Sequence, residues 1–420
     1  MELRQLPLAG LARARRMLRT LDVTTGVDSR ITRRHFGRDG VTSASSSRRN
    51  HVLVAPPGQG NVGDQSMVEA FCENSVHPVV LVTRYADDLS VPADLANRVS
   101  IVPIDGLLNG RGRLHAKAVR QFTALLEDAR TVSVIGADIM DGAYNPRTSV
   151  RRSDIATCAR RAGFDTRVIG FSWSSHPTRS ALRSLRTAGD AGVRLCVRDP
   201  LSAERARVDG VSGVVETADI VFAATSVSSS ARSTLVPFAG AYAVVNASGL
   251  LTSPDQADDL ARVVVHLIEG GLPVLLLPHV IRPLTGDREA CKAVLRAIDP
   301  ARSDSVALWE GDVVSPAEIR GIAEGATVVV TGRMHLAINA LFSGVPAVIL
   351  ASQGKVEGLA RLFDRDELCL DAGPGAAERI TAALDAVLAD RESVSYDLRA
   401  RLPRIRRSAL DNLHGLDSAH

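Results

Sequence analysis

The sequence predicts two Rossmann-type α/β domains, each a doubly wound parallel sheet, that face each other across a cleft. Short apolar runs rich in β-branched residues recur along the chain with helical patterns between them, as in consecutive βαβ units. A serine-rich segment with Pro237, residues 226–240, divides these runs into two series and is typical of an interdomain linker. Ligands of such sheets bind beyond the carboxyl ends of the strands, so we expect the functional residues in the loops there.

The first domain is expected to span residues 51–235. Its first strand begins at His51, and further strands are expected at 79–83, 100–103, 131–135, 167–171, 193–197 and 219–223. The second domain is expected to span residues 236–390, with strands at 242–246, 273–277, 305–309, 327–331, 345–350 and 368–371. Residues 391–420 are expected to form a helix end and a tail, the last dozen residues of which we expect to be disordered.

Composition narrows the class of protein. The chain is 45% hydrophobic and 23% charged, as in ordinary globular proteins, and no apolar run approaches the ~18 residues of a membrane span. No signal-peptide core follows Met1, so we expect a cytoplasmic location. Five scattered cysteines argue against a disulfide framework and a zinc site, and a net charge of +3 is too small to indicate nucleic-acid binding.

Residues 1–50 are interpreted as a basic N-terminal arm and linker, because they hold eleven arginines against four acidic residues. Residues 6–21 have an amphipathic helical pattern with arginines on the polar face, which can lie on an anionic membrane surface. A packed or frayed helix explains this pattern equally well. Residues 24–50 end in a serine-rich run and are expected to be a flexible linker.

A loop with three glycines, residues 58–64, follows the first strand and precedes a helical pattern. A glycine loop at a helix start can cradle a phosphate or a sugar, because its N–H groups point outward. The spacing matches neither a dinucleotide-binding loop nor a phosphate loop with its lysine. Asp64 at the end of this loop is interpreted either as the cap of the helix or as a base that faces the cleft.

The stretch from Thr327 to Pro346 combines a buried strand, Gly332 and a short helical pattern. The turn between strand and helix carries Arg333 and His335, a permanent cation and a titratable imidazole. A helix N-terminus favours anions, so this pair suits an anionic substrate that gains or loses a proton. The alternative is that Arg333 braces a neighbouring loop and His335 fills a satisfied polar pocket.

Taken in order, the loop motifs resemble those of the polysaccharide pyruvyl transferase family. The matching pieces are Gly60-Asn61-Val62-Gly63-Asp64, the loop that ends in Asp141, Gly170-Phe171-Ser172, Val197-Arg198-Asp199, Ala218-Asp219, Leu277-Pro278-His279, Gly332-Arg333-Met334-His335, Gly344-Val345-Pro346 and Lys355. The resemblance implies a GT-B-like fold and transfer of the enolpyruvyl group of phosphoenolpyruvate to a sugar, which forms a pyruvate ketal. One loop departs from the family, because Gly136-Ala137-Asp138 stands where the family usually has a run of glycines.

This chemistry suggests roles for the matching residues. Arg333 and Arg198 can grip the carboxylate or phosphate of phosphoenolpyruvate from the two domains, although Arg198 could also brace its own loop. His335 is the first candidate for the acid that protonates the methylene carbon, and His279 is the second. Asp64 or Asp141 could deprotonate the acceptor hydroxyl or hold the sugar.

The same resemblance places Asn61, Gly63 and Lys355 among the substrate-binding residues. We expect no metal and no cofactor besides phosphoenolpyruvate as the donor substrate. The expected acceptor is a saccharide of a cell-envelope or exopolysaccharide glycan, free or linked to a lipid. A lipid-linked acceptor would place the protein at the inner face of the membrane. Two alternatives stay open: a nucleotide-sugar-dependent glycosyltransferase of the same fold, and a non-catalytic sugar- or anion-binding relative.

Overall fold

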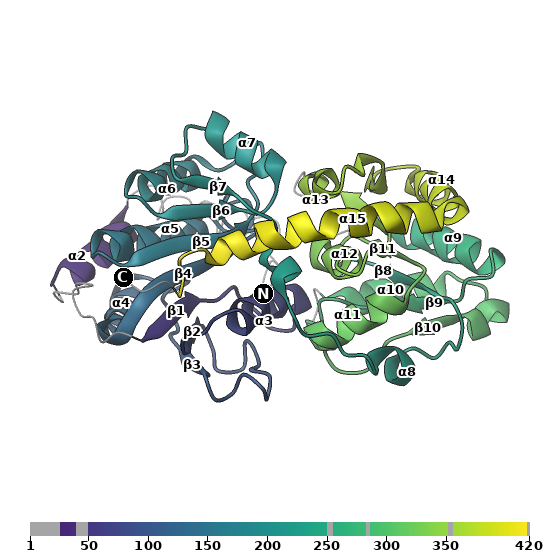
Figure 1. Cartoon of the computed structure of the whole chain (residues 1–420), viewed down its shortest axis with the longest axis horizontal. Coiled ribbons are helices and arrows are strands. Elements are labelled where there is room, and N and C mark those ends of the chain that lie inside the picture. Colours follow the sequence, from purple (N-terminus) through teal and green to yellow (C-terminus); the bar gives the residue numbers. More distant parts are fainter. Residues whose placement is uncertain (1–25, 39–48, 250–254, 283–285, 352–355, 418–420) are drawn as a thin grey trace, which may run out of the picture.

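The computed structural model describes residues 26–38, 49–249, 255–282, 286–351 and 356–417. Two α/β lobes lie side by side, and the long helix α15 (Arg391–Leu410) runs along both of them (Figure 1). The amphipathic pattern at residues 6–21 lies outside the described residues. Within the described part of the chain, no helix is long and apolar enough to cross a membrane.

Seven parallel strands form the sheet of the first lobe, in the order β3-β2-β1-β4-β5-β6-β7. They are β1 (Asn50–Val54), β2 (Val79–Thr83), β3 (Val99–Pro103), β4 (Ala129–Ala137), β5 (Asp165–Phe171), β6 (Arg194–Val197) and β7 (Val214–Glu216). The central strands β1 and β4 are buried along almost their whole length, because helices cover both faces of the sheet. The order reverses between β1 and β4, so the sheet is doubly wound as predicted.

The strand predicted at residues 219–223 is wrong. Residues Ile220–Ala223 form the 3-10 helix η2, because the Asp219 carboxylate accepts a hydrogen bond from the N–H of Val221 at 3.0 Å and turns the chain. The last strand of the sheet is instead β7, a three-residue edge strand that we did not predict. The correction matters for function, since it places Asp219 in the loop after a strand.

Helices pack on both faces of the first sheet. They are α3 (Val62–Glu73), α4 (Gly112–Leu125), η1 (Leu126–Asp128), α5 (Pro146–Arg161), α6 (Arg179–Asp190) and α7 (Pro200–Val208).

A further helix, α2 (Val27–Arg38), contradicts the flexible linker that we expected at residues 24–50. Its Asp28 pairs with the buried Arg151 of α5, and its Phe36 ring lies 6.2 Å from that of Phe122. The helix is therefore part of the packed lobe. The prediction failed because we judged this segment by its serine and arginine content, whereas Asp28 and Phe36 hold the helix in place.

The second lobe has six parallel strands in the order β10-β9-β8-β11-β12-β13. The strands are β8 (Ala243–Asn246), β9 (Val274–Leu276), β10 (Val306–Leu308), β11 (Val328–Thr331), β12 (Ala347–Ala351) and β13 (Cys369–Asp371). The helices are α9 (Asp255–Glu269), α10 (Asp287–Arg296), η3 (Pro300–Ser305), α11 (Pro316–Gly325), α12 (Met334–Leu341), α13 (Glu357–Leu362), η4 (Asp366–Leu368) and α14 (Ala376–Ala389). The short helix α8 (Ala231–Leu235) lies in the connection between the lobes. This second doubly wound sheet agrees with the predicted fold class.

One hydrophobic cluster spans both lobes, and each lobe also has a cluster of its own. Met67 and Phe71 of α3 belong to the same buried cluster as Leu336 and Leu341 of α12. The first turns of α3 and α12 also meet at the lobe boundary, because Gly63 of α3 lies against the His335 side chain of α12.

The chain end returns to the first lobe, which contradicts the disordered tail that we expected. Helix α15 is followed by η5 (Asp411–Leu413), and the Asn412 side chain donates to Ala218 O at 2.9 Å and accepts from Gly170 N at 3.2 Å. Asp417 lies 2.9 Å from the buried His51. These contacts could not be predicted from the polar composition of the tail, because the groups that Asn412 and Asp417 bind belong to the first lobe.

Candidate active site

The glycine loop before α3 is joined to a loop of the second lobe. Asn61 caps α3, since its side chain accepts from the N–H of Gly63 at 3.0 Å, and it forms an antiparallel bridge with Val280. The N–H of Ile281 donates to Gly60 O at 2.9 Å. Gly60 has a φ of 76°, and a Cβ there would lie 2.1 Å from Ile281 O, so a glycine is required at this contact. The loop thus holds the lobes together, as well as beginning α3.

His335 lies directly against the start of α3. A Cβ on Gly63 would lie 2.3 Å from His335 Nδ1, so the imidazole packs on the bare glycine backbone. The other ring nitrogen, Nε2, lies 3.5 Å from Asp219 Oδ2, and the side chain is 11% exposed. The structure therefore brings together Gly63 and His335, which the sequence separates by more than half the chain.

Asp219 is the central residue that we did not assign to the site. It is buried between His335 and Arg198, whose Nη1 lies 3.1 Å from its Oδ2. Burial alone would raise the pKa of Asp219, but the His335 and Arg198 charges lower it to about 2. The carboxylate is therefore ionised at neutral pH. The Ala218-Asp219 motif was the available signal, but we interpreted it as the start of a strand.

Arg198 is completely buried and is held by partners of its own lobe. Its Nε donates to Ser172 Oγ at 2.8 Å, and its terminal nitrogens pair with Asp219 and Asp138. Burial alone would lower the pKa of Arg198, but Asp138 and Asp219 raise it. The guanidinium thus already faces two carboxylates before any substrate binds.

Asp138 reaches Arg198 from the loop that departs from the family pattern. Ala137 before it has a φ of 46°, in the left-handed region that favours glycine, and this turn directs the Asp138 carboxylate onto the guanidinium. Asp138 is also among the more exposed members of the site, with a side chain 36% exposed. The Asp138 side chain of this loop therefore occupies part of Arg198, the arginine that the resemblance predicts to bind the anionic substrate.

His279 is buried next to His335. Neither of its ring nitrogens has a hydrogen-bond partner among the described residues. Burial and the His335 charge lower the pKa of His279 to about 3, so its ring is neutral at physiological pH. A neutral imidazole is a poor proton donor, which favours His335 over His279 as the acid.

Asp64 lies in the first turn of α3 and is also buried. Its Oδ2 accepts from the N–H of Gly58 at 3.1 Å and lies 3.9 Å from Arg282 of the second lobe. Burial raises the pKa of Asp64, while the His335 and Arg282 charges oppose that shift. The cap of α3 is Asn61, so Asp64 does not have the capping role that we considered, and a carboxyl group with a raised pKa suits a general base.

Arg333 turns toward its own lobe. It occupies the N-cap position of α12, and its guanidinium forms a two-pronged ion pair with the fully buried Asp287, at 3.0 Å from Nε and 2.5 Å from Nη2 to Oδ1. Burial alone would raise the pKa of Asp287, but Arg333 lowers it. Asp287 also accepts from the backbone N–H groups of His279 and Val280. This acid was missed, because only the tertiary fold brings α10 to this turn.

Two predicted residues are not placed at this cluster. Asp141 is buried in the loop before α5, where its Oδ1 accepts from the N–H of Ala143 at 3.0 Å. Lys355 lies outside the described residues. Within the described ranges, no three His, Cys, Asp or Glu side chains gather as metal ligands would.

Solved structures share the fold of this chain at low sequence identity. Sucrose-phosphate synthase from Thermosynechococcus elongatus matches with a TM-score of 0.56 and 15% identity, over 87% of this chain and 97% of that one. UDP-GlcNAc 2-epimerase from Neisseria meningitidis matches with a TM-score of 0.55 and 10% identity, over 87% and 98%. The epimerase from Methanocaldococcus jannaschii matches with a TM-score of 0.54 and 11% identity, over 81% and 93%. These likenesses confirm the GT-B-like fold and carry no further conclusion.

No curated protein sequence matches the chain. A sequence model described as polysaccharide pyruvyl transferase matches residues 111–354, which is more than half of the chain. The matched region contains Arg198, Asp219, His279, Arg333 and His335, and it begins after the glycine loop. With the two facing sheets and the buried cluster between them, the match shows that the chain belongs to the polysaccharide pyruvyl transferase family.

Proposed function

We propose that the protein transfers the enolpyruvyl group of phosphoenolpyruvate to a saccharide and closes it to a pyruvate ketal. The observation that carries the proposal is the buried chain Arg198–Asp219–His335, with Asp64 facing it from α3. In this proposal His335 is the proton donor, Asp219 is the carboxylate that supports it, and Asp64 is the base. The family match supports a transferase that acts on a polysaccharide.

In the proposed reaction, His335 donates a proton to the methylene carbon of phosphoenolpyruvate, which leaves an oxocarbenium-like centre at the neighbouring carbon. One sugar hydroxyl attacks that carbon, and its proton passes to Asp64. A second hydroxyl of the same sugar displaces inorganic phosphate, which carries away the second proton. The proton held by Asp64 returns to His335, so the cluster ends in the state in which it began.

The anionic donor needs positive charge, and the structure offers it at two points. Arg333 lies at the N-terminus of α12, where the helix dipole also favours an anion. Arg198 lies deeper and is shared between Asp219 and Asp138. Because Asp138 is the more exposed of these two acids, we propose that the carboxylate of phosphoenolpyruvate takes its place on Arg198.

The experiment combines purified protein, phosphoenolpyruvate and a panel of cell-envelope and exopolysaccharide fragments. Phosphate release together with a glycan mass increase of one pyruvate ketal is the expected result. His335→Ala is expected to slow both by roughly 100-fold or more. His266→Ala is the matched control, because His266 is an exposed histidine of α9 paired with Asp385. Stabilisation by nucleotide sugars with no response to phosphoenolpyruvate would instead favour a glycosyltransferase.

A lipid-linked acceptor, and with it a location at the inner face of the membrane, is a further part of this proposal. It depends on the arginine-rich residues 6–21, which lie outside the described residues. Deletion of residues 1–25 tests it without removing the packed helix α2. Binding to anionic vesicles should be lost on deletion, and unchanged binding would contradict the membrane role of the arm.

A further inference from the structure

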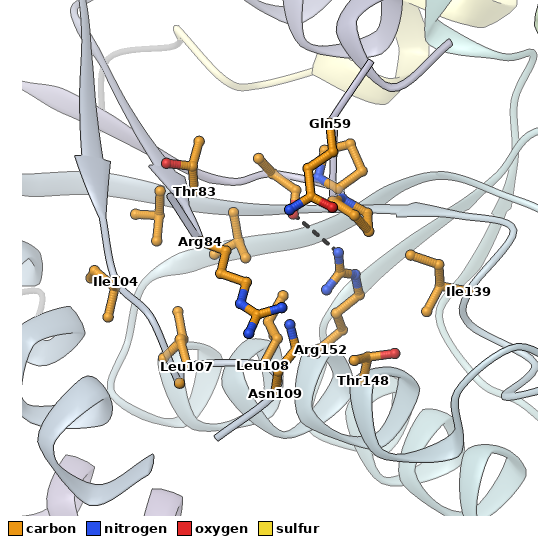
Figure 2. A pocket seen from close by; sticks show the side chains of 16 residues that line it. Gln59, Thr83, Arg84, Ile104, Leu107, Leu108, Asn109, Ile139, Thr148 and Arg152 are labelled. Atoms are coloured by element: carbon orange, nitrogen blue, oxygen red, sulfur yellow. Dashed lines mark hydrogen bonds between the residues drawn. The ribbon is translucent and has the colours of Figure 1, made fainter. Parts of the chain in front are cut away.

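A cavity of about 80 Å³ lies in the first lobe, beyond the carboxyl ends of β1, β2 and β3 (Figure 2). Its inner walls are apolar and include Ile104, Leu107 and Ile139. Its rim is polar, with the exposed side chains of Gln59, Arg84 and Asn109. The proposed transfer mechanism uses none of these residues.

Arg152 of α5 lines the inner part of this cavity and is only 1% exposed. Its Nε donates to Ile135 O at 3.2 Å and its Nη2 donates to Ala55 O at 3.0 Å. Its Nη1 has no hydrogen-bond partner among the described residues, and Figure 2 shows this nitrogen turned toward the cavity. The five N–H groups of a buried arginine normally all have acceptors, so the Nη1 group without a partner indicates that an acceptor is missing.

The charge of Arg152 is also incompletely balanced. No carboxylate of the described residues lies within ion-pairing distance, and the more distant Asp64 offsets its charge only in part. Burial lowers the pKa of Arg152 to about 10, so the side chain is still a cation at neutral pH. A buried cation among apolar walls is stabilised by an anion that enters the cavity.

Arg84 supplies a second positive charge at the rim. Its guanidinium and that of Arg152 face the same space in Figure 2, with Asn109 between them. Arg84 forms an ion pair with Asp105, and both side chains are nearly half exposed, so this pair is weak and open to exchange. Two arginines and an amide around one space match the acceptor oxygens of a carboxylate or a phosphate.

The cavity is connected to the candidate active site through the glycine loop. Gln59 lines the cavity, and the neighbouring Gly58 donates to the Asp64 carboxylate at 3.1 Å. Carbonyl oxygens of Gly58 and Gln59 also accept from Arg282 of the second lobe. A ligand in the cavity would therefore contact the loop that positions Asp64.

We propose that this cavity binds an oxyanion, a carboxylate or a phosphate ester, carried by the acceptor saccharide. The cavity of about 80 Å³ has room for the charged group only, which the two arginines bind. The sugar ring stays at the rim, where the amides of Gln59 and Asn109 bind its hydroxyls. This inference rests on the proposed function for the identity of the ligand as the acceptor. The site is separate from the donor site at Arg198 and His335.

The test uses ligand-observed saturation-transfer NMR, which detects weak sugar binding, with glucuronate, glucose 1-phosphate and neutral glucose. The proteins are the wild type, Arg84→Gln, Leu108→Trp and Arg207→Gln. Leu108 lines the cavity and is half-buried, so a tryptophan there fills the space. Arg207 is the matched control, an exposed arginine of the same lobe paired with Glu216. The thermal midpoint of each variant confirms that it is folded.

At least one charged sugar is expected to bind the wild type and Arg207→Gln about tenfold more tightly than glucose, as for one charge-assisted hydrogen bond. Arg84→Gln should lose most of that preference, and Leu108→Trp should lose binding. A preference for glucuronate identifies a sugar carboxylate as the ligand, and one for glucose 1-phosphate identifies a phosphate ester. Equal binding of glucose, or unchanged binding by both cavity variants, would overturn the proposal.

The outcomes separate this inference from the proposed function. The binding measurement is repeated with His335→Ala, which leaves the cavity intact. If charged sugars bind through Arg84 but pyruvate is never transferred, the cavity site stands and the proposed function fails. If pyruvate is transferred and the KM for charged acceptors is the same in Arg84→Gln, the function stands and the cavity proposal fails.

Discussion

The pairing of Asp138 with Arg198 leads to a prediction that is contrary to the usual effect of removing an active-site carboxylate. Asp138→Asn keeps the size of the side chain and removes its charge. Arg198 then keeps Asp219 as its one paired acid among the described residues, and its free side can bind the carboxylate of phosphoenolpyruvate. We therefore expect phosphoenolpyruvate to bind the variant more tightly than the wild type.

The size of the effect follows from the exposure of the pair. A charge-assisted hydrogen bond contributes roughly 1.5–3 kcal/mol when buried. Asp138 is 36% exposed, so solvent screening weakens its interaction with Arg198 to about 1 kcal/mol. This is the free energy that phosphoenolpyruvate must overcome to displace Asp138. This corresponds to roughly a fivefold lower Kd for phosphoenolpyruvate.

Isothermal titration calorimetry with phosphoenolpyruvate measures this change directly. Asp165→Asn is the matched control, because Asp165 is a similarly exposed carboxylate, at 30%, that pairs with another buried arginine, Arg167. The control should bind as the wild type does. A Kd for Asp138→Asn that is equal to or higher than that of the wild type would refute the idea that Asp138 competes with the donor.

Three further predictions concern the cluster and its supports. Asp64→Asn should slow transfer by roughly 100-fold or more, measured as phosphate release, and a smaller loss would exclude Asp64 as the base. Burial raises the pKa of Asp64 in the folded protein above 3.8, so the free energy of unfolding of the wild type falls as the pH rises through the folded-state pKa. The thermal midpoint of Asp64→Asn should therefore lie above that of the wild type at pH 8 and approach it near pH 4. Asp287→Ala leaves Arg333 without its buried partner, and urea unfolding should show a loss of about 3 kcal/mol, whereas an unchanged midpoint would contradict the role of the pair. Asn412→Ala should lower the free energy of unfolding by about 2 kcal/mol, since two buried backbone groups of the first lobe lose their partners; no change would mean that the chain end is not anchored there.

Most of the fold could be predicted because parallel sheets buried on both faces need continuous β-branched runs. Such runs mark β2, β4, β5 and β11 clearly. The prediction failed where polar side chains set the local structure. Asp219 turns the chain into η2, and β7 is a three-residue edge strand too short for periodicity to detect.

The candidate site was predictable in its location and only partly in its pairing. The segments that follow strands β1, β6 and β11 do carry Asp64, Arg198 and His335, as the rule for open sheets requires. Asp219 and Asp287 were missed as partners, because an ion pair between distant segments leaves no pattern in the local sequence. Asp138 was noticed as a departure, but its contact with Arg198 depends on the left-handed turn at Ala137.

The sequence by itself determined the two doubly wound domains, the family and the loops that carry the chemistry, because hydrophobic periodicity and short motifs are local properties of the chain. Only the tertiary structure decided which acid faces each cation. The pairs Arg198–Asp219, Arg333–Asp287 and His335–Asp219 join segments far apart in the chain. Their partners are selected by how the sheets and lobes pack, and that packing also leaves one nitrogen of Arg152 without an acceptor among the described residues.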